Sequence, residues 1–143
     1  MPTITNEASR WQLVPLLFTQ DAVAASQTDA QLNIAEVNAG AALAVTGYTM
    51  PFAGYIVGQS YDLSAAGTTG TFTIGPTVNG TEKTALTQTV GTTTQGRKTV
   101  PRESIPFVAG DIIGAEITTG GTWDGTSSDL AVLVWVLLKM EGI

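Results

Sequence analysis

The sequence contains no cysteine and no histidine, and each absence excludes a class of chemistry. Without cysteine there is no disulfide, no thiolate nucleophile and no cysteine-ligated metal. Without histidine the chain lacks the commonest metal ligand and the only side chain whose unperturbed pKa lies near neutrality. We therefore expect no metal, no cofactor and no catalytic site, and we interpret the chain as a non-enzymatic protein.

Charged residues are also scarce, at 13% of 143 residues, and acids outnumber bases by 12 to 6. The resulting net charge of −6 repels phosphate backbones, so we expect no nucleic-acid partner. The longest apolar run has nine residues, whereas roughly 20 are needed to cross a bilayer, so we expect no membrane partner either. No basic segment followed by an apolar core opens the chain, and the expected place of synthesis is the cytoplasm of the cell that makes it.

That apolar run, residues 130–138, is the clearest structural signal that the sequence does contain. It is rich in valine and lacks the polar interruptions, spaced 3.6 residues apart, of a surface helix. A short run of this kind predicts a strand in the middle of a sheet, buried on both faces. We expect a second layer of the fold to cover it, so that Val134 and Trp135 are both core residues.

The rest of the chain consists of short segments separated by turn signals roughly every ten residues. Asn79-Gly80 is the strongest hairpin signal, because both central positions of a type I′ turn need a positive φ. Residues 82–90 are expected to return from that turn as a strand, and residues 91–96 to form an exposed loop. This spacing predicts an all-β, antiparallel, jelly-roll-like sandwich. The other expected strands are 13–18, limited by Pro15 to an edge or a bulge, 30–37, 45–50, 53–61, 71–78, and 108–117, which begins with a turn.

Residues 1–12 are expected to form an extended N-terminal arm in front of a single sandwich domain, residues 13–143. Pro2 and the Thr, Asn and Ser content of this segment oppose a helix. Ile4 and Trp11 are nevertheless costly to leave in water. Either Trp11 folds back onto its own domain, or the arm lies on a neighbouring molecule. Ile4 and Trp11 are therefore the predicted residues for a contact with another subunit or with a partner protein.

Other candidate sites have simpler explanations. Asp124 and Asp129 flank a Gly-Thr-Ser-Ser segment whose oxygen atoms suit a cation by composition. The spacing does not match an EF-hand, and an Asx-turn loop is favoured. The glycine-containing segments 67–70 and 91–96 lack the lysine of a phosphate-binding loop. No two carboxylates are placed by the pattern as an acid and base pair.

Three short motifs carry a family resemblance. They are Phe107-x-x-Gly110-Asp111-x-Ile113, Met50-Pro51-x-x-Gly54-x-Ile56 and Pro76-x-Val78-Asn79-Gly80. Together they resemble the small trimeric decoration proteins, also called auxiliary or cement proteins, that bind outside the capsids of tailed bacteriophages, including siphoviruses of thermophilic bacteria. The resemblance spans about residues 43–138 and the arm-like N-terminus.

This resemblance implies a homotrimer on the exterior of the virion, bound to the major capsid protein and stabilising the shell. Neighbouring decoration trimers are further candidate partners. An alternative keeps the fold and changes the function to a receptor- or carbohydrate-binding head of a phage fibre. Tyr61 and Trp123, expected to be exposed around loops, would then form its binding site.

Overall fold

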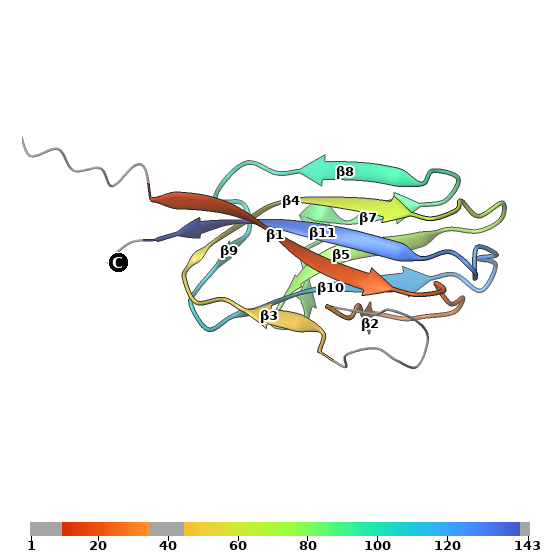
Figure 1. Cartoon of the computed structure of the whole chain (residues 1–143), viewed down its shortest axis with the longest axis horizontal. Helices are drawn as coiled ribbons and strands as arrows, with labels where there is room; N and C mark the ends of the chain where they lie inside the picture. The colour runs from red at the N-terminus through yellow and green to blue at the C-terminus, as the bar shows by residue number, and fades with distance from the viewer. Residues whose placement is uncertain (1–9, 35–44, 141–143) are drawn as a thin grey trace, which may run out of the picture.

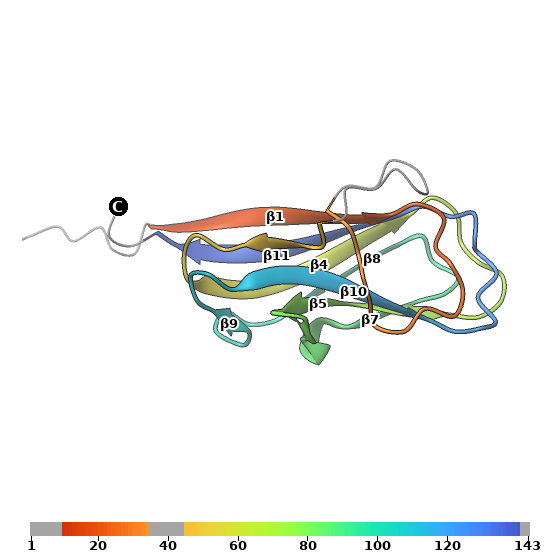
Figure 2. The same ribbon diagram turned by 90° about the horizontal axis from the view of Figure 1, so that it is seen from below.

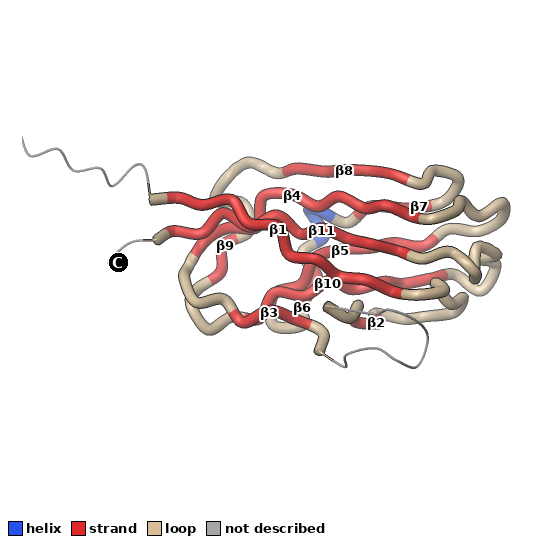
Figure 3. The backbone as a smooth tube through the Cα atoms, in the orientation of Figure 1, coloured by secondary structure: helices blue, strands red, loops and turns tan. Residues whose placement is uncertain are grey.

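A computed structural model describes residues 10–34 and 45–140, and within these ranges the regular secondary structure is almost entirely antiparallel strand (Figure 1). Two sheets pack face to face in an elongated sandwich. The only helical element of the described part is one turn of 3-10 helix, η2 (Thr84–Leu86) (Figure 3). The all-β antiparallel sandwich is therefore confirmed, whereas the jelly-roll path stays a prediction.

The first sheet, which we call sheet A, has the strand order β1-β11-β4-β8, with β9 beside β4. β11 contains the apolar run of the sequence and lies between β1 and β4, with which it pairs along almost its whole length. Its predicted position inside a sheet is confirmed. The strands of sheet A are β1 (Trp11–Gln20), β4 (Gly54–Leu63), β8 (Gln95–Thr99), β9 (Pro106–Phe107) and β11 (Leu130–Lys139).

The second sheet, sheet B, has the order β2-β10-β5-β6, with β3 beside β10 and β7 beside β5. Figure 2 shows β1 and β11 in one layer and β10 and β5 in the other. The strands of sheet B are β2 (Ala30–Gln31), β3 (Gly47–Thr49), β5 (Phe72–Val78), β6 (Thr81–Glu82), β7 (Gln88–Val90) and β10 (Ile112–Thr119).

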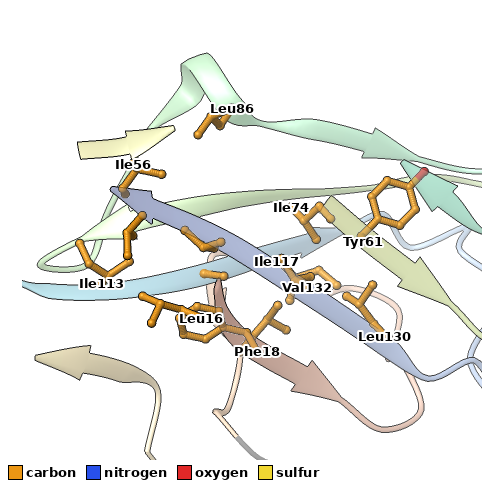
Figure 4. Packing of buried hydrophobic residues seen from close by; sticks show 14 of the residues in the cluster. Leu16, Phe18, Ile56, Tyr61, Ile74, Leu86, Ile113, Ile117, Leu130 and Val132 are labelled. Carbon is orange, nitrogen blue, oxygen red and sulfur yellow. The ribbon is translucent and has the colours of Figure 1, made fainter. Parts of the chain in front are cut away.

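The core lies between the two sheets, because successive side chains of a strand point to opposite faces. From sheet A, the inner face of β11 buries every second residue; these are Leu130, Val132, Val134, Val136 and Leu138. From sheet B, Ile74, Ile113 and Ile117 meet them and are 0% exposed (Figure 4). Each such side chain stabilises the fold by about 1.5–3 kcal/mol through burial.

Two predicted turns meet at one end of sheet B. Asn79 and Gly80 both have positive φ, at 50° and 78°, and connect β5 to β6 as the hairpin signal predicted. Asn79 also donates its side-chain N–H to Asp111 at 2.9 Å, while Asp111 accepts the backbone N–H of Val108 at 2.9 Å. These hydrogen bonds to an ionised carboxylate lower the pKa of Asp111 below its ordinary value, and tie the hairpin to the turn that enters β10.

Several predicted boundaries are wrong where the apolar pattern is sparse. Residues 82–90 do not form one strand but β6, η2 and β7. The predicted loop at 91–96 ends early, because β8 begins at Gln95 and pairs with β4 even though it has no large apolar residue. β1 begins at Trp11, so the expected arm loses its last two residues to the sandwich. In the described part of segment 30–37, only Ala30–Gln31 form a strand.

Candidate interaction surface

The outer side of sheet A carries an apolar surface that no part of the described chain covers. The register places Leu13 opposite Leu137, and Leu17 opposite Leu133, with all four side chains pointing away from the core. Val57 of β4 and Trp135 of β11 complete the surface. We call it the outer apolar face; it consists of Leu13, Leu17, Val57, Leu133, Trp135 and Leu137.

The exposure of these residues corrects one prediction from the sequence. Leu13 and Leu17 are 53% and 42% exposed, and the outward residues of β11 are only half-buried. The run 130–138 is thus covered by sheet B on one face alone, and Trp135 is not a core residue as Val134 is. An apolar run of this kind normally has both faces covered, so the second cover is missing from the part of the chain that the structure describes.

A groove crosses the outer apolar face between β1 and β8. Its volume is about 410 Å³, and its lining includes Leu13, Val57 and Trp135. The indole N–H of Trp135 donates to Ser60 Oγ at 3.4 Å, which holds the ring over β4. Arg97 and Thr99 of β8 form the other wall. The groove is therefore an apolar recess with a base beside it.

Basic residues gather around this surface. Of the six bases in the sequence, only Lys83 lies away from the strands and contacts of sheet A. Arg102 and Lys139 both lie over the ring of Trp11, at 5.4 and 6.0 Å from its centroid. The remaining three are Arg10, which immediately precedes β1, and Arg97 and Lys98 of β8. Arg97, Arg102 and Lys139 thus place three of the six positive charges on the side of the outer apolar face, whereas the ammonium of Lys98 points to Thr87.

Trp11, one of the two contact residues predicted from the sequence, lies at the edge of this face. It is the first residue of β1, pairs with Lys139 and stacks on Tyr55, with ring centroids 5.7 Å apart and an interplanar angle of 24°. Trp11 therefore packs on its own domain, which was one of the two interpretations left open. Ile4, the other predicted contact residue, lies outside the described residues.

The outer side of sheet B is more polar, although Ile112 of β10 lies there and is 48% exposed. Glu116 of β10 lies there, only 7% exposed, and accepts a hydrogen bond from Gln31 at 3.2 Å. Burial raises the pKa of Glu116 above its ordinary value, and the carboxylates of Glu82 and Asp29 raise it further. Thr77 lies beside this group and contacts Gln31. The two outer faces of the sandwich therefore differ in chemistry.

The aromatic residues proposed for a fibre-head binding site are buried, so that prediction of exposed loop aromatics is wrong. Tyr61 is 4% exposed and hydrogen-bonds Thr93 through its hydroxyl at 2.8 Å. Trp123 is 3% exposed, packs edge-on against Phe72 and donates its indole N–H to the carbonyl of Val23 at 3.2 Å. Both rings serve the core, so neither is available to stack on a sugar.

Asp124 and Asp129 organise loops, as the favoured interpretation of their segment predicted. Asp124 accepts the side-chain hydroxyl of Thr68 and the backbone N–H groups of Thr69 and Thr68, the latter two at 3.0 and 2.8 Å, and these bonds lower its pKa below the ordinary value. Asp129 accepts the backbone N–H of Ala22 at 3.2 Å. No group of three or more acidic residues in residues 10–34 and 45–140 is arranged to hold a metal ion.

The sequence pattern did not reveal the outer apolar face, because a continuous apolar run does not show which alternate residues a second sheet will cover.

Within the described ranges, no helix is long and apolar enough to cross a membrane. A scan against protein-family models finds no matching family, and a search of curated proteins finds no match.

Proposed function

We propose that this chain is a non-enzymatic structural protein of a tailed-bacteriophage particle. It binds the outside of the assembled capsid as a homotrimer and stabilises the shell. The observation that carries this proposal is the outer apolar face, where a central strand as apolar as the core remains half-uncovered. Contiguous apolar surface of this kind marks a site of association with another protein.

The difference between the two outer faces supports attachment on one side. Sheet A presents Leu13, Leu133 and Trp135, whereas sheet B presents Glu116 and Thr77, with Ile112 as its one large exposed apolar side chain in the described part of the chain. A protein seated on a shell needs one face that excludes water and one that stays hydrated. The outer apolar face is then directed to the capsid protein, and the outer side of sheet B to the solvent.

A protein that binds only the assembled lattice stabilises that state by mass action. Three linked copies contact the lattice at several points at once, so individually modest interfaces combine by avidity. No bond needs to be made or broken for this role, which is consistent with a chain that has no cysteine and no histidine.

The test is cosedimentation of the purified protein with DNA-free capsids of the phage that encodes it, beside its solution mass. We expect a trimer that binds the capsids, and Leu133→Asp should abolish binding. Thr73→Asp, which places the same charge on the outer side of sheet B, is the matched control and should bind normally. A monomeric protein, or capsid binding unaffected by Leu133→Asp, would overturn the proposal.

A further inference from the structure

We propose that the groove over Trp135 binds an acidic segment of a partner protein. An aliphatic or aromatic side chain of the segment fills the groove, and a neighbouring carboxylate pairs with Arg97. This inference rests on the proposed function, in which the outer apolar face contacts a partner protein. It adds the chemistry of the partner surface that enters the groove.

The floor of the groove is preformed for a side chain. Trp135 lies opposite Gly58 in the ladder between β11 and β4, and the register shifts at this point, so that Val57 is an extra residue in β4. Glycine inside a strand often marks the close approach of another chain or ligand. Gly58 lines the groove, and a Cβ built there would lie 3.3 Å from the carbonyl oxygen of Lys98 and 3.8 Å from Trp135 Cβ, so the site has little room for a side chain of its own. The hydrogen bond to Ser60 holds the Trp135 ring in place.

The size of the groove suits one large side chain rather than a broad protein surface. Its volume of about 410 Å³ lies near the lower end of the range of about 300–1,000 Å³ that is usual for ligand pockets. Leu13, at 53% exposed, stands at its β1 side. A single buried apolar anchor in such a recess is the typical centre of a protein interface.

Charge defines the rest of the ligand. The guanidinium of Arg97 has no hydrogen bond, ion pair or ring contact with any residue of the described part of the chain. Lys98, the next residue, is engaged differently, because its ammonium donates to the carbonyl of Thr87 at 3.1 Å. A planar guanidinium is well suited to bind a carboxylate through two parallel hydrogen bonds. The carboxylate is therefore expected beside the apolar anchor.

A second copy of this chain fits the groove less well. If two copies met through the same face, each would bring Arg97, Arg102 and Lys139 toward the other, and like charges placed together oppose association. Asp62, an acid on the outer side of β4, already accepts a hydrogen bond from Gln95 at 3.0 Å. Charge complementarity therefore favours a different, acidic surface.

The experiment titrates the full chain with two synthetic peptides and follows the signals of Gly58, Thr99 and the Trp135 indole by NMR. The probe is acetyl-Asp-Glu-Phe-Asp-amide, and its uncharged counterpart is acetyl-Asn-Gln-Phe-Asn-amide. We expect shifts centred on those three residues and about tenfold weaker binding of the uncharged peptide, the effect of one charge-assisted hydrogen bond.

Three variants assign the effect to the groove. Arg97→Gln should remove most of the preference for the acidic peptide, whereas Lys83→Gln, with the same loss of charge outside sheet A, should keep it. Gly58→Val should block both peptides, because Gly58 does not need a positive φ and an added side chain projects beside Trp135. Arg97 is exposed, so Arg97→Gln provides a readout even if Gly58→Val fails to fold.

Equal binding of the two peptides, shifts centred elsewhere, or equal effects of Arg97→Gln and Lys83→Gln would overturn the inference. Sedimentation of the same samples provides a further criterion. If Arg97→Gln or Gly58→Val lowers the mass of the protein, the groove is a contact between copies and the inference is wrong. Failure of capsid binding alone would remove the proposed function and leave the peptide result standing, so the two failures are distinguishable.

Discussion

Trp135 lies directly opposite Gly58 in sheet A, at the residue where the pairing of β11 with β4 shifts register. The residue before it, Val134, points the other way and is 0% exposed in the core. One step along the strand thus separates the interior of the sandwich from its outer apolar face. Substitutions at neighbouring positions of β11 are therefore expected to affect different properties.

Val134→Asp and Leu133→Asp place the same carboxylate on the two faces of β11. Val134→Asp should lower the free energy of unfolding by more than about 3 kcal/mol, because an unpaired carboxylate would be buried between the sheets. Leu133→Asp should change it by less than about 1 kcal/mol, since this side chain is only half-buried. Urea denaturation measures both, and equal losses would show that the outer face is also core.

Gly80→Ala tests the hairpin between β5 and β6. Gly80 has a φ of 78°, and a Cβ built there contacts nothing within 4 Å, so the cost is purely conformational. A non-glycine residue in this left-handed region loses about 1–2 kcal/mol. We expect the free energy of unfolding, measured by thermal or urea denaturation, to decrease by that amount. Gly121→Ala, in a loop where φ is not positive, is the control and should be close to neutral.

Glu116→Gln tests the buried carboxyl on the outer side of sheet B. Its pKa is raised in the folded state, so the protonated form favours folding and ionisation costs stability as the pH rises through that pKa. Glutamine carries no charge at any pH. The variant should therefore melt at a higher temperature than the parent at pH 7, and this advantage should shrink as the pH falls toward about 4, where free carboxyls protonate.

Melting temperatures of the parent and of Glu116→Gln between pH 3 and 8 measure the effect. The exposed Glu103→Gln is the matched control for the loss of one negative charge. If the difference in melting temperature between Glu116→Gln and the parent stayed constant across the whole pH range, the raised pKa of Glu116 would be contradicted.

Deleting residues 1–9 should leave the melting temperature unchanged, because β1 begins at Trp11 and its pairing with β11 is retained. Deleting residues 1–12 should lower it, since that cut removes Trp11 and the first two pairs of the ladder. Trp11→Ala should itself cost about 1 kcal/mol through the lost stack on Tyr55. If both deletions melt like the parent, Trp11 does not stabilise the sandwich.

Local patterns in the sequence determined the fold class and several of its parts. The nine-residue apolar run predicted β11 and its place inside a sheet, and Asn79-Gly80 predicted the hairpin. Both signals depend on neighbouring residues: the length and composition of one strand, and the φ angles of one turn. β8 has no such signal, because QGRKT forms a strand only through its pairing with β4.

The tertiary structure alone decided which residues lie on the outside. Long-range register assigned Trp11 to β1, buried Tyr61 and Trp123, and left Trp135 half-uncovered. It also brought Leu13, Gly58, Arg97 and Trp135 together around one groove, although they lie far apart in the sequence. The physical reason is that a strand has two faces, and only the packing of a second sheet determines which of them is covered.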